Sequence, residues 1–421
     1  MTKVFKFGGT SIKDANNIKR IAEILIKYAS ENLVVVFSAM GKITNMLEEV
    51  VEDYMQKNGQ AEDKLQLVKD FHAHLLGELF ESNHAIYNEV NNLFVEIEWV
   101  LEDEPNLDYA FNYDQIVSVG ELLSTKIMSA YLNENGFENS WVDVRDIIRT
   151  DNKYRNAKID WEQTISSCKE NINSFPITTQ GFIGCTSENF TTTLGREGSD
   201  FTAAILAFSL DAEQVIIWKD VDGVLNADPR FFKETEQLMS IPFEEAIELA
   251  YYGAKVMHPK TIQPLQKKSI PLEVKSFLNP KKESSIIGDF ESITPFVPSY
   301  IVKENQILIS IADKNLSFIV EEHLSSIFSL FSNFGARVNM MQNSAVSFSF
   351  CIDNDSHKIP ELLDALKKNF KVYFNENLIM YTIRHYNEDS ISKLLINKEL
   401  LLEQKSRHTI HLVVKDNGII A

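Results

Sequence analysis

Short apolar runs without alternation, each followed by a helix-like segment, constrain the fold of this chain most. Residues 33–37 read Leu-Val-Val-Val-Phe. A strand that is apolar on both faces is typical of a parallel sheet covered by helices. Between such strands apolar residues recur at helical spacing, as at Ile18, Ile21 and Leu25. Residues 1–293 therefore predict an α/β domain with a mainly parallel sheet flanked by helices.

Other segments follow the same alternation of strand and helix. We predict strands at residues 4–7, 33–37, 141–144, 177–183, 215–218 and 270–277, helices at 120–135, 199–210 and 243–254, and a charged helical insertion over about 46–104. Ser11 and Asp14 have the spacing of a capping box, so we expect the first helix to start there. Residues 191–196 are polar and are expected to form a turn.

The pattern changes after residue 293, where Pro295 and Pro298 predict a linker. Strand-like and helix-like segments then follow in a ferredoxin-like order, β-α-β-β-α-β, and a second unit of this kind starts near residue 378. The second unit ends before its last helix. We therefore expect domains at residues 1–293, 300–377 and 378–421, the last of them a truncated unit.

Charge and cysteine content limit the partners and the compartment. The formal net charge of −19 opposes binding to nucleic acid and to anionic membranes, so neither is expected as a partner. No apolar run approaches the roughly 18 residues of a membrane span, and the N-terminus lacks the apolar core of a secretion signal. Cys168, Cys185 and Cys351 are far apart and form no disulfide or metal pattern, so a reducing, cytoplasmic location is expected.

A lysine in an apolar strand is the first candidate for phosphate binding, because the chain contains neither a Walker A nor a GxGxxG sequence. Lys6 precedes the Gly8-Gly9 turn that leads into a helix. Glycines let backbone N–H groups approach a phosphate, the helix N-terminus favours an anion, and lysine supplies a point charge. Taken alone, these residues favour a plain tight turn beside a solvated lysine, because Gly-Gly turns are common, and the apolar strand around Lys6 shifts this balance only somewhat.

Two further polar segments lie between apolar elements. Residues 193–200 place Arg196 between glycines and put Ser199 and Asp200 at a helix start, a combination that can bind a carboxylate and hold a lysine or Mg²⁺. An ordinary N-capped helix explains the serine and the aspartate but not the glycines. Residues 219–230 follow a strand, where α/β folds bind ligands, although their Asp-Gly and Asp-Pro pairs are also typical of turns.

The histidines show no catalytic or metal-binding pattern. His258 precedes a proline, and we expect it to make a structural hydrogen bond. His72 and His74 are expected on a solvated helix face.

Seven segments, taken together and in order, identify a family. They are KFGGTS (6–11), SAMGKITNML (38–47), SVGELLS (118–124), TQGFIG (179–184), TTTLGREGSD (191–200), WKDVDGVLNADPR (218–230) and GAKVMHP (253–259). With them the chain closely resembles the aspartokinases, members of the amino-acid kinase superfamily, and its tail resembles their paired ACT regulatory domains. The resemblance implies the α/β amino-acid kinase fold followed by α+β, ferredoxin-like ACT domains.

The resemblance also implies an activity: transfer of the ATP γ-phosphoryl group to the β-carboxylate of L-aspartate, giving 4-phospho-L-aspartate, the first step towards lysine, threonine and methionine. It implies catalytic roles for Lys6 and Asp200, substrate binding by Ser38, Thr44, Glu121, Arg196 and Ser199, and ATP binding by Lys6, Gly8, Gly9, Ser11, Lys219, Asp220, Leu225, Arg230 and Lys255. In this scheme Glu121 receives the substrate ammonium group and Arg196 its α-carboxylate. ATP and Mg²⁺ are expected as cofactors, with the metal held mainly by the nucleotide, and a homodimer through the ACT domains is expected.

Several positions depart from the family pattern. Glu197 stands where many relatives have glycine, and Lys219 and Leu225 replace a threonine and a tyrosine of some relatives' nucleotide sites. In lysine-inhibited relatives an aspartate and a glutamate of the first ACT unit lie at the effector site, where this chain has Asn339 and Ala345. Because both carboxylates are missing, we hypothesise that lysine inhibition is weak or absent.

Two other functions stay open on the sequence alone. Another amino-acid kinase would act on glutamate, acetylglutamate or a nucleotide, but the Glu121 and Arg196 segments and the ACT-like tail favour aspartate. A catalytically inactive amino-acid sensor is permitted by Glu197 and Lys219, whereas Lys6 favours an enzyme. A fused homoserine dehydrogenase is not expected, because no segment of that size follows the tail.

Overall fold

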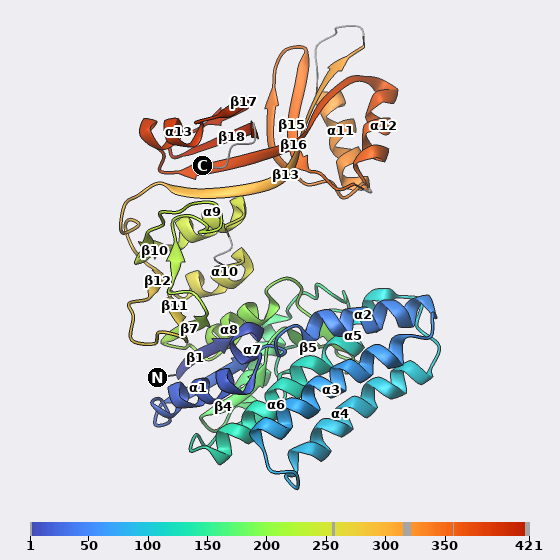
Figure 1. The fold of residues 1–421 in the computed structure, drawn as a ribbon, viewed down its shortest axis with the longest axis vertical. Coiled ribbons are helices and arrows are strands. Elements are labelled where there is room, and N and C mark those ends of the chain that lie inside the picture. Colours follow the sequence, from blue (N-terminus) through green and yellow to red (C-terminus); the bar gives the residue numbers. More distant parts are fainter. Residues whose placement is uncertain (1, 255–256, 315–320, 357, 417–421) are drawn as a thin grey trace. The chain divides into compact units, whose positions relative to one another are not determined.

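A mainly parallel sheet with β1 near its middle organises most of the first 294 residues (Figure 1). In spatial order its eight strands are β10 (Ser240–Pro242), β12 (Ser285–Gly288), β11 (Leu272–Ser276), β7 (Gln214–Lys219), β1 (Thr2–Phe7), β2 (Asn32–Phe37), β4 (Ile177–Gln180) and β3 (Ser140–Val142). Neighbouring strands are parallel, except that β11 and β12 are antiparallel. Phe5, Val35 and Ile217 are fully buried, which confirms the predicted two-sided sheet.

The computed structural model describes residues 2–254, 257–314, 321–356 and 358–416. The chain forms two compact units. The first contains Met1–Val224, Gln237–Ile247 and Val256–Thr294, and the second contains Leu225–Glu236, Glu248–Lys255 and Pro295–Ala421. Within the described ranges, no helix combines the length and the apolar character that crossing a membrane requires.

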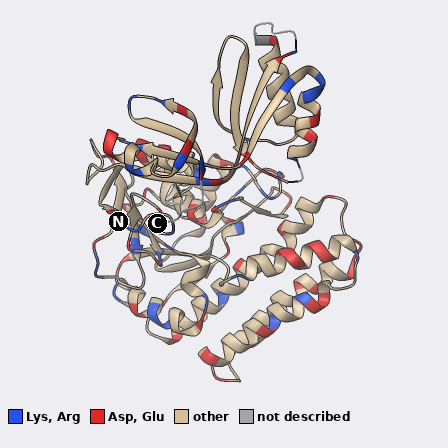
Figure 2. Ribbon diagram, turned by 45° about the horizontal axis from the view of Figure 1, so that its top comes forward, with Lys and Arg blue, Asp and Glu red and all other residues tan. Residues whose placement is uncertain are grey.

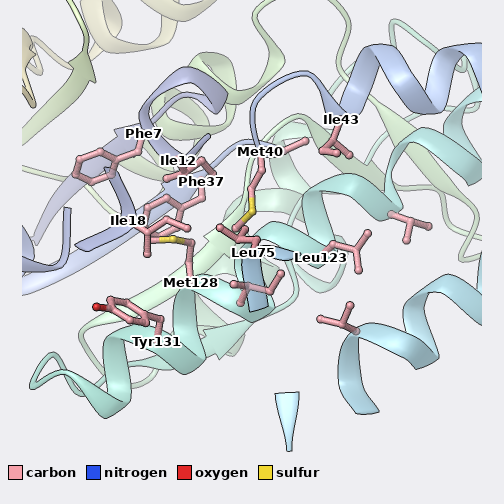
Figure 3. Close-up of a cluster of buried hydrophobic side chains, with 14 of the residues drawn as sticks. Phe7, Ile12, Ile18, Phe37, Met40, Ile43, Leu75, Leu123, Met128 and Tyr131 are labelled. Carbon is pink, nitrogen blue, oxygen red and sulfur yellow. The ribbon is translucent and has the colours of Figure 1, made fainter. Parts of the chain in front are cut away.

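Helices cover the sheet of the first unit. The helices that precede the C-terminal sheet are α1 (Ala15–Ile26), α2 (Ile43–Gln56), α3 (Ala61–Leu79), α4 (Ile86–Glu102), α5 (Tyr109–Val117), α6 (Val119–Glu134), α7 (Trp161–Asn171), α8 (Gly198–Ser209), α9 (Phe243–Tyr252) and α10 (Pro259–Lys267). α8 packs on β1, β2 and β7, and α6 packs on β2 and β4. Figure 3 shows Phe37 of β2, Ile18 of α1 and Met128 of α6 in one buried apolar cluster.

The predicted helical insertion is confirmed as α2, α3 and α4, which form a lobe together with α5. α2 packs on α3 and α5, and α4 packs on α3 and α6. Leu65 and Leu75 of α3 and Phe94 and Ile97 of α4 are buried. Figure 2 shows many Asp and Glu residues along these helices. The lobe therefore has an apolar inner side and an acidic outer side, as amphipathic helices on a globular domain do.

The predicted turn at residues 191–196 is partly wrong. β6 (Thr191–Thr193) pairs with β5 (Ile183–Cys185), because β-branched threonines suit an extended strand. The predicted strand at 177–183 is interrupted after β4, since Phe182 has a φ of 72° and cannot continue the ladder. A second small sheet joins β8 (Val224–Leu225) and β9 (Gln237–Leu238).

The predicted capping box is also wrong. Asp14 itself is the N-cap of α1, and its carboxylate accepts the N–H of Asn17 at 2.9 Å. Ser11 lies one turn earlier, in a 3-10 turn over Gly9–Ile12 that continues from the glycine pair. The helix therefore starts after this extra turn, at the better of two possible caps.

The second unit is built on a six-stranded antiparallel sheet in the order β14-β15-β13-β16-β18-β17. Its elements are β13 (Ser299–Asp313), α11 (Glu321–Asn333), β14 (Val338–Asn343), β15 (Ser347–Asp353), α12 (Ile359–Asn369), β16 (Phe370–Arg384), α13 (Glu388–Leu394), β17 (Lys398–Lys405) and β18 (Thr409–Asp416). The elements from β13 to β16 have the predicted β-α-β-β-α-β order. Ile309, Phe350 and Leu366 belong to the buried cluster formed by these strands and helices.

Two long strands connect the halves of this sheet. β13 and β16 pair from Ser299–Arg384 at one end to Asp313–Phe370 at the other, with register irregularities between Lys303 and Leu308. The predicted boundary between residues 377 and 378 falls inside β16. β17 was not predicted, because its sequence KELLLEQK does not alternate and most of its side chains are exposed or half-exposed.

His258 and the cysteines have the structural roles expected. His258 is the N-cap of α10, and its ring accepts the N–H of Lys260 at 3.2 Å. Cys168, Cys185 and Cys351 are buried thiols outside any disulfide, and Cys351 Sγ donates to Gln306 Oε1 at 3.5 Å.

The prediction that His72 is solvated is wrong. Its ring is fully buried, Nδ1 contacts the carbonyl oxygen of Val68 at 2.8 Å, and Phe71 and Phe94 present ring edges to it. Burial lowers the pKa of His72 to about 4, although the hydrogen bond to Val68 opposes this. His74, two residues later, is exposed as predicted.

This burial predicts an acid-labile fold. The unfolded chain binds a proton at His72 below about pH 6.5, whereas the folded chain does so only near pH 4. The contribution of the neutral His72 to the free energy of unfolding is therefore fully present above pH 6.5 and is lost as the pH falls from 6.5 to 4. The loss amounts to roughly 3 kcal/mol. Urea unfolding of His72→Phe should lack this part of the pH dependence. The matched variant His74→Phe should keep it, and an unchanged slope in His72→Phe would contradict the assignment.

Candidate active site

Segments that follow the C-terminal ends of β1, β2 and β4 line a pocket of about 490 Å³ in the first unit. Parallel sheets commonly bind ligands at this edge. The predicted residues that line the pocket are Lys6, Gly9, Ser38, Thr44, Glu121, Arg196, Ser199 and Asp200. The structure thus brings together all the residues predicted to be catalytic or to bind the substrate, although they are spread over most of the first 200 positions.

Lys6 and Asp200 form a buried ion pair in the pocket wall. Lys6 Nζ lies 2.6 Å from Asp200 Oδ1, and Lys219 Nζ lies 3.9 Å from Oδ2. Burial alone would raise the pKa of Asp200, but the charges of Lys6 and Lys219 outweigh it and hold the pKa below its ordinary value. The aspartate therefore stays ionised and fixes the ammonium group of Lys6 beside the pocket.

The glycine turn after β1 interlocks with the loop after β2. A Cβ on Gly9 would lie 2.6 Å from the carbonyl oxygen of Ala39, so only glycine fits there. The N–H of Gly41 donates to the oxygen of Gly9 at 3.0 Å, and the N–H of Ser11 donates to that of Gly8 at 2.9 Å. The turn next to Lys6 is thereby held in a compact form whose backbone can approach a ligand closely.

Glu121 of α6 is a buried carboxylate with an unused oxygen. Only 3% of the residue is exposed, and its Oε2 has no hydrogen-bond partner among the described residues. Burial raises the pKa of Glu121 to about 8, although the backbone N–H of Ala39 and the charge of Lys6 oppose the rise. A carboxylate in this state gains most from a cationic ligand, because the ligand supplies the missing hydrogen bond and charge.

The start of α8 lies against the end of β4. A Cβ on Gly181 would come within 2.4 Å of the Ser199 Cβ, so this approach requires glycine. Arg196 is exposed at the pocket rim, and no carboxylate within the described ranges lies within ion-pair distance of its guanidinium. Glu197, the N-cap of α8, has a φ of 55° in the left-handed region.

Glu48, Tyr113 and Arg155 also line the pocket, and they lie outside all the motifs from which the site was predicted. The hydroxyl of Tyr113 donates to Glu48 Oε1 at 2.7 Å, and the Arg155 guanidinium lies 4.4 Å from the centre of the Tyr113 ring. Glu48 lies in α2, Tyr113 in α5 and Arg155 in a loop, so no motif joins them. Only their common proximity in the fold reveals them.

Asp114 of α5 supports this wall from behind. It is fully buried, and its carboxylate accepts the N–H of Thr193 at 2.8 Å, the hydroxyl of Thr193 at 2.7 Å and the N–H of Arg155 at 3.0 Å. Burial raises the pKa of Asp114 to about 6, against the lowering effect of these donors. The aspartate fixes Arg155, whose φ is 65°, at the pocket rim.

The predicted nucleotide-binding residues are divided between the units. Lys219 and Asp220 belong to the end of β7 and the following turn in the first unit, whereas Leu225 and Arg230 belong to the second unit. Lys255 lies outside the described residues. Nucleotide binding by this group remains a prediction.

The sequence is similar to a family profile and to named aspartokinases. The profile of the Amino acid kinase family matches residues 1–276. Lysine-sensitive aspartokinase 3 of Escherichia coli is 32% identical over 354 residues, which cover 83% of this chain and 78% of that protein. Aspartokinase 1, chloroplastic, of Arabidopsis thaliana is 33% identical over 368 residues, which cover 84% of this chain and 63% of that protein.

Solved structures share the fold along the whole chain. Aspartokinase III of E. coli, in complex with lysine and aspartate in its T-state, matches with a TM-score of 0.83 at 28% identity, over 98% of this chain and 95% of that chain. The same enzyme with aspartate and ADP, in its R-state, matches with a TM-score of 0.82 at 28% identity, over 98% and 96% of the two chains. By its sequence, its fold and the residues gathered in its pocket, this chain belongs to the aspartokinases of the amino acid kinase family.

Proposed function

We propose that this chain is an aspartate kinase, which transfers the γ-phosphoryl group of ATP to the β-carboxylate of L-aspartate to give 4-phospho-L-aspartate. One observation carries the proposal: a single pocket contains groups that can bind the phosphoryl group and groups that can bind the amino acid. The Lys6–Asp200 pair lies beside the glycine turn, where it can meet phosphoryl oxygens. Glu121 and Arg196 offer an anion and a cation to the amino-acid end of the substrate.

The chemistry needs no general base, because the β-carboxylate is already ionised at neutral pH. One of its oxygens attacks the γ-phosphorus, the bond to the β,γ-bridging oxygen breaks, and ADP leaves with that electron pair. The protein contributes positioning and charge neutralisation. Lys6 Nζ, held by Asp200, and the backbone amides of Gly8 and Gly9 provide positive charge beside the phosphoryl group in transfer.

ATP and Mg²⁺ complete the proposed reaction. A Mg²⁺ ion bound to the nucleotide phosphates would neutralise further charge on them. Asp200 already pairs with Lys6, so its carboxylate fits the role of orienting the lysine and adjoining the metal rather than that of a sole metal ligand. Lys219 and Asp220 lie at the end of β7, next to β1, and are proposed to contact the nucleotide.

A homodimer through the second unit and a cytoplasmic location are part of the proposal. Met341, Val346 and Tyr373 of the β14, β15 and β16 region are 48%, 41% and 66% exposed, and methionine and aromatic side chains are enriched in subunit interfaces.

The primary test is aspartate-dependent formation of acyl phosphate with Mg·ATP, trapped as the hydroxamate. Wild type should form the hydroxamate, and Lys6→Ala should lower kcat by about 10²–10³-fold, because one preorganised positive group is lost. Lys3→Ala is the matched control: Lys3 lies on the same strand but pairs with Glu31 at the surface.

Three results would contradict the proposed activity, the proposed substrate or the proposed role of Lys6. No hydroxamate from a folded, ATP-binding wild type favours an amino-acid sensor. Activity with glutamate but not aspartate keeps the reaction type and replaces the substrate. Equal losses in Lys6→Ala and Lys3→Ala remove the assigned role of Lys6.

Glu121 predicts a pH dependence of aspartate use. Below its pKa of about 8 the carboxyl is protonated in the free enzyme and binds an ammonium group less well. The value of kcat/KM for aspartate should therefore rise about tenfold per pH unit well below pH 8 and level off above it. Glu121→Gln should be less active and should lose this slope, whereas a slope retained in Glu121→Gln would assign the titration to another group.

The hydrogen bonds around Asn339 in the second unit support the hypothesis that lysine inhibits this chain weakly or not at all. Lys303 Nζ donates to Asn339 Oδ1 at 2.8 Å, and Asn339 Nδ2 donates to Gln306 Oε1 and to Asp353 Oδ1, each at 2.8 Å. Both the oxygen and the nitrogen of the Asn339 amide are thus already hydrogen-bonded, and the oxygen already accepts from the ammonium group of Lys303. Ala345 offers no polar side-chain atom.

We therefore expect that L-lysine at sub-millimolar concentration leaves the kinase activity unchanged. Asn339→Asp alone should not create inhibition, because the ammonium group of Lys303 would pair with the new carboxylate. A lysine titration of both proteins in the hydroxamate assay checks this. Strong inhibition of the wild type at such concentrations would refute the expectation.

A further inference from the structure

Glu197 occupies a backbone position that suits its residue type poorly. Its φ and ψ are 55° and 30°, in the left-handed region that glycine adopts freely and that glutamate rarely adopts. As the N-cap of α8 it makes no side-chain capping bond. Neither helix capping nor backbone preference therefore accounts for a glutamate at this position.

The side chain is also incompletely satisfied. Oε2 of Glu197 is buried, and it has no hydrogen-bond partner within the described ranges. A buried carboxylate oxygen without a donor loses its water and receives nothing in return, which disfavours the folded state. Glu197 lines the same pocket as Glu121, which is itself 3% exposed and also has a buried oxygen without a partner. These two carboxylate oxygens of the pocket have no partner among the described residues, whereas Asp200 Oδ1 meets Lys6 Nζ at 2.6 Å.

The neighbours of Glu197 indicate which ligand group it meets. Arg196 precedes it and is the proposed partner of the substrate's α-carboxylate. In an α-amino acid the ammonium group is bonded to the carbon that carries this carboxylate, so it must lie close to the Arg196 guanidinium. An ammonium group has three N–H donors, more than the single free oxygen of Glu121 can accept.

We propose that Glu197 is a specificity-determining residue that accepts a hydrogen bond from the α-ammonium group of the substrate, so that Glu121 and Glu197 share this cation. The inference rests on the proposed function and adds a second carboxylate to its amino-acid end. In the substrate complex, the ammonium group provides the donor that the Glu197 oxygen lacks. This role explains why a glutamate occurs at a backbone position that glycine would suit better.

The test compares L-aspartate with succinate, which has the same two carboxylates but no ammonium group. The KM for aspartate and the inhibition constant of succinate are measured for wild type, Glu197→Gln and Glu197→Gly. Both variants should raise the KM for aspartate about tenfold or more, with the loss chiefly in KM, because a charge-assisted hydrogen bond is removed. The inhibition constant of succinate should stay the same or fall.

Lys57→Gly provides the matched control. Lys57 has a φ of 53° at the exposed end of α2, outside the pocket. Lys57→Gly and Glu197→Gly should both raise the Tm by removing a left-handed non-glycine residue, but only Glu197→Gly should change the KM for aspartate.

The outcomes separate the possible roles. An unchanged or lower KM for aspartate in both Glu197 variants overturns the inference and indicates that the glutamate is neutral or repels the substrate carboxylates. A parallel rise of the aspartate KM and the succinate constant also overturns it, because the effect would then be structural. Absence of hydroxamate from the wild type would instead contradict the proposed function itself.

Discussion

A lysine in the central strand of a buried sheet is tolerated only if a carboxylate meets it, and this requirement governs the layout of the first unit. Lys6 on β1 and Asp200 on α8 lie 2.6 Å apart with little access to water. Removing one partner of such a pair typically costs about 3–5 kcal/mol, because the other charge stays buried. The pair therefore couples the packing of α8 on β1 to the placement of positive charge beside the pocket. Under the proposed function, stability and catalysis would depend on the same contact.

Two buried carboxylates near the pocket differ in their hydrogen bonding, and this difference indicates a structural role for one and a ligand-binding role for the other. Asp114 receives three donors from Thr193 and Arg155, and it holds the pocket wall in place. Glu121 retains an oxygen without a donor. Asp114 and Glu121 are both acidic residues buried within helices. They differ in whether all their carboxylate oxygens have hydrogen-bond donors. The satisfied carboxylate holds the pocket wall in place, whereas the unsatisfied one is proposed to meet the ammonium group of the substrate.

Local sequence patterns predicted the sheet, the helical insertion and the ferredoxin-like order, because each depends on spacing within a short segment. The pocket residues were predicted from motifs, whereas Tyr113 and Glu48, which are 65 positions apart, were not, since nothing in a local pattern links them. His72 was mispredicted from its residue type alone. Its spacing from Leu65, Val68 and Leu75 in fact places it on the apolar face of α3. The capping-box error arose because two polar residues three positions apart, Ser11 and Asp14, could each cap the start of the helix.

The pairing of β13 with β16 has a mechanical consequence. Each strand has 15 residues, and at about 3.3 Å per residue the ribbon is roughly 50 Å long. Both halves of the C-terminal sheet are attached to this ribbon, so they share two continuous strands rather than being joined by a linker. The register of the ribbon shifts between Lys303 and Leu308, where the side chain of Lys303 donates to Asn339 of β14. A load on either half would pass to the other through the hydrogen-bonded ladder of β13 and β16.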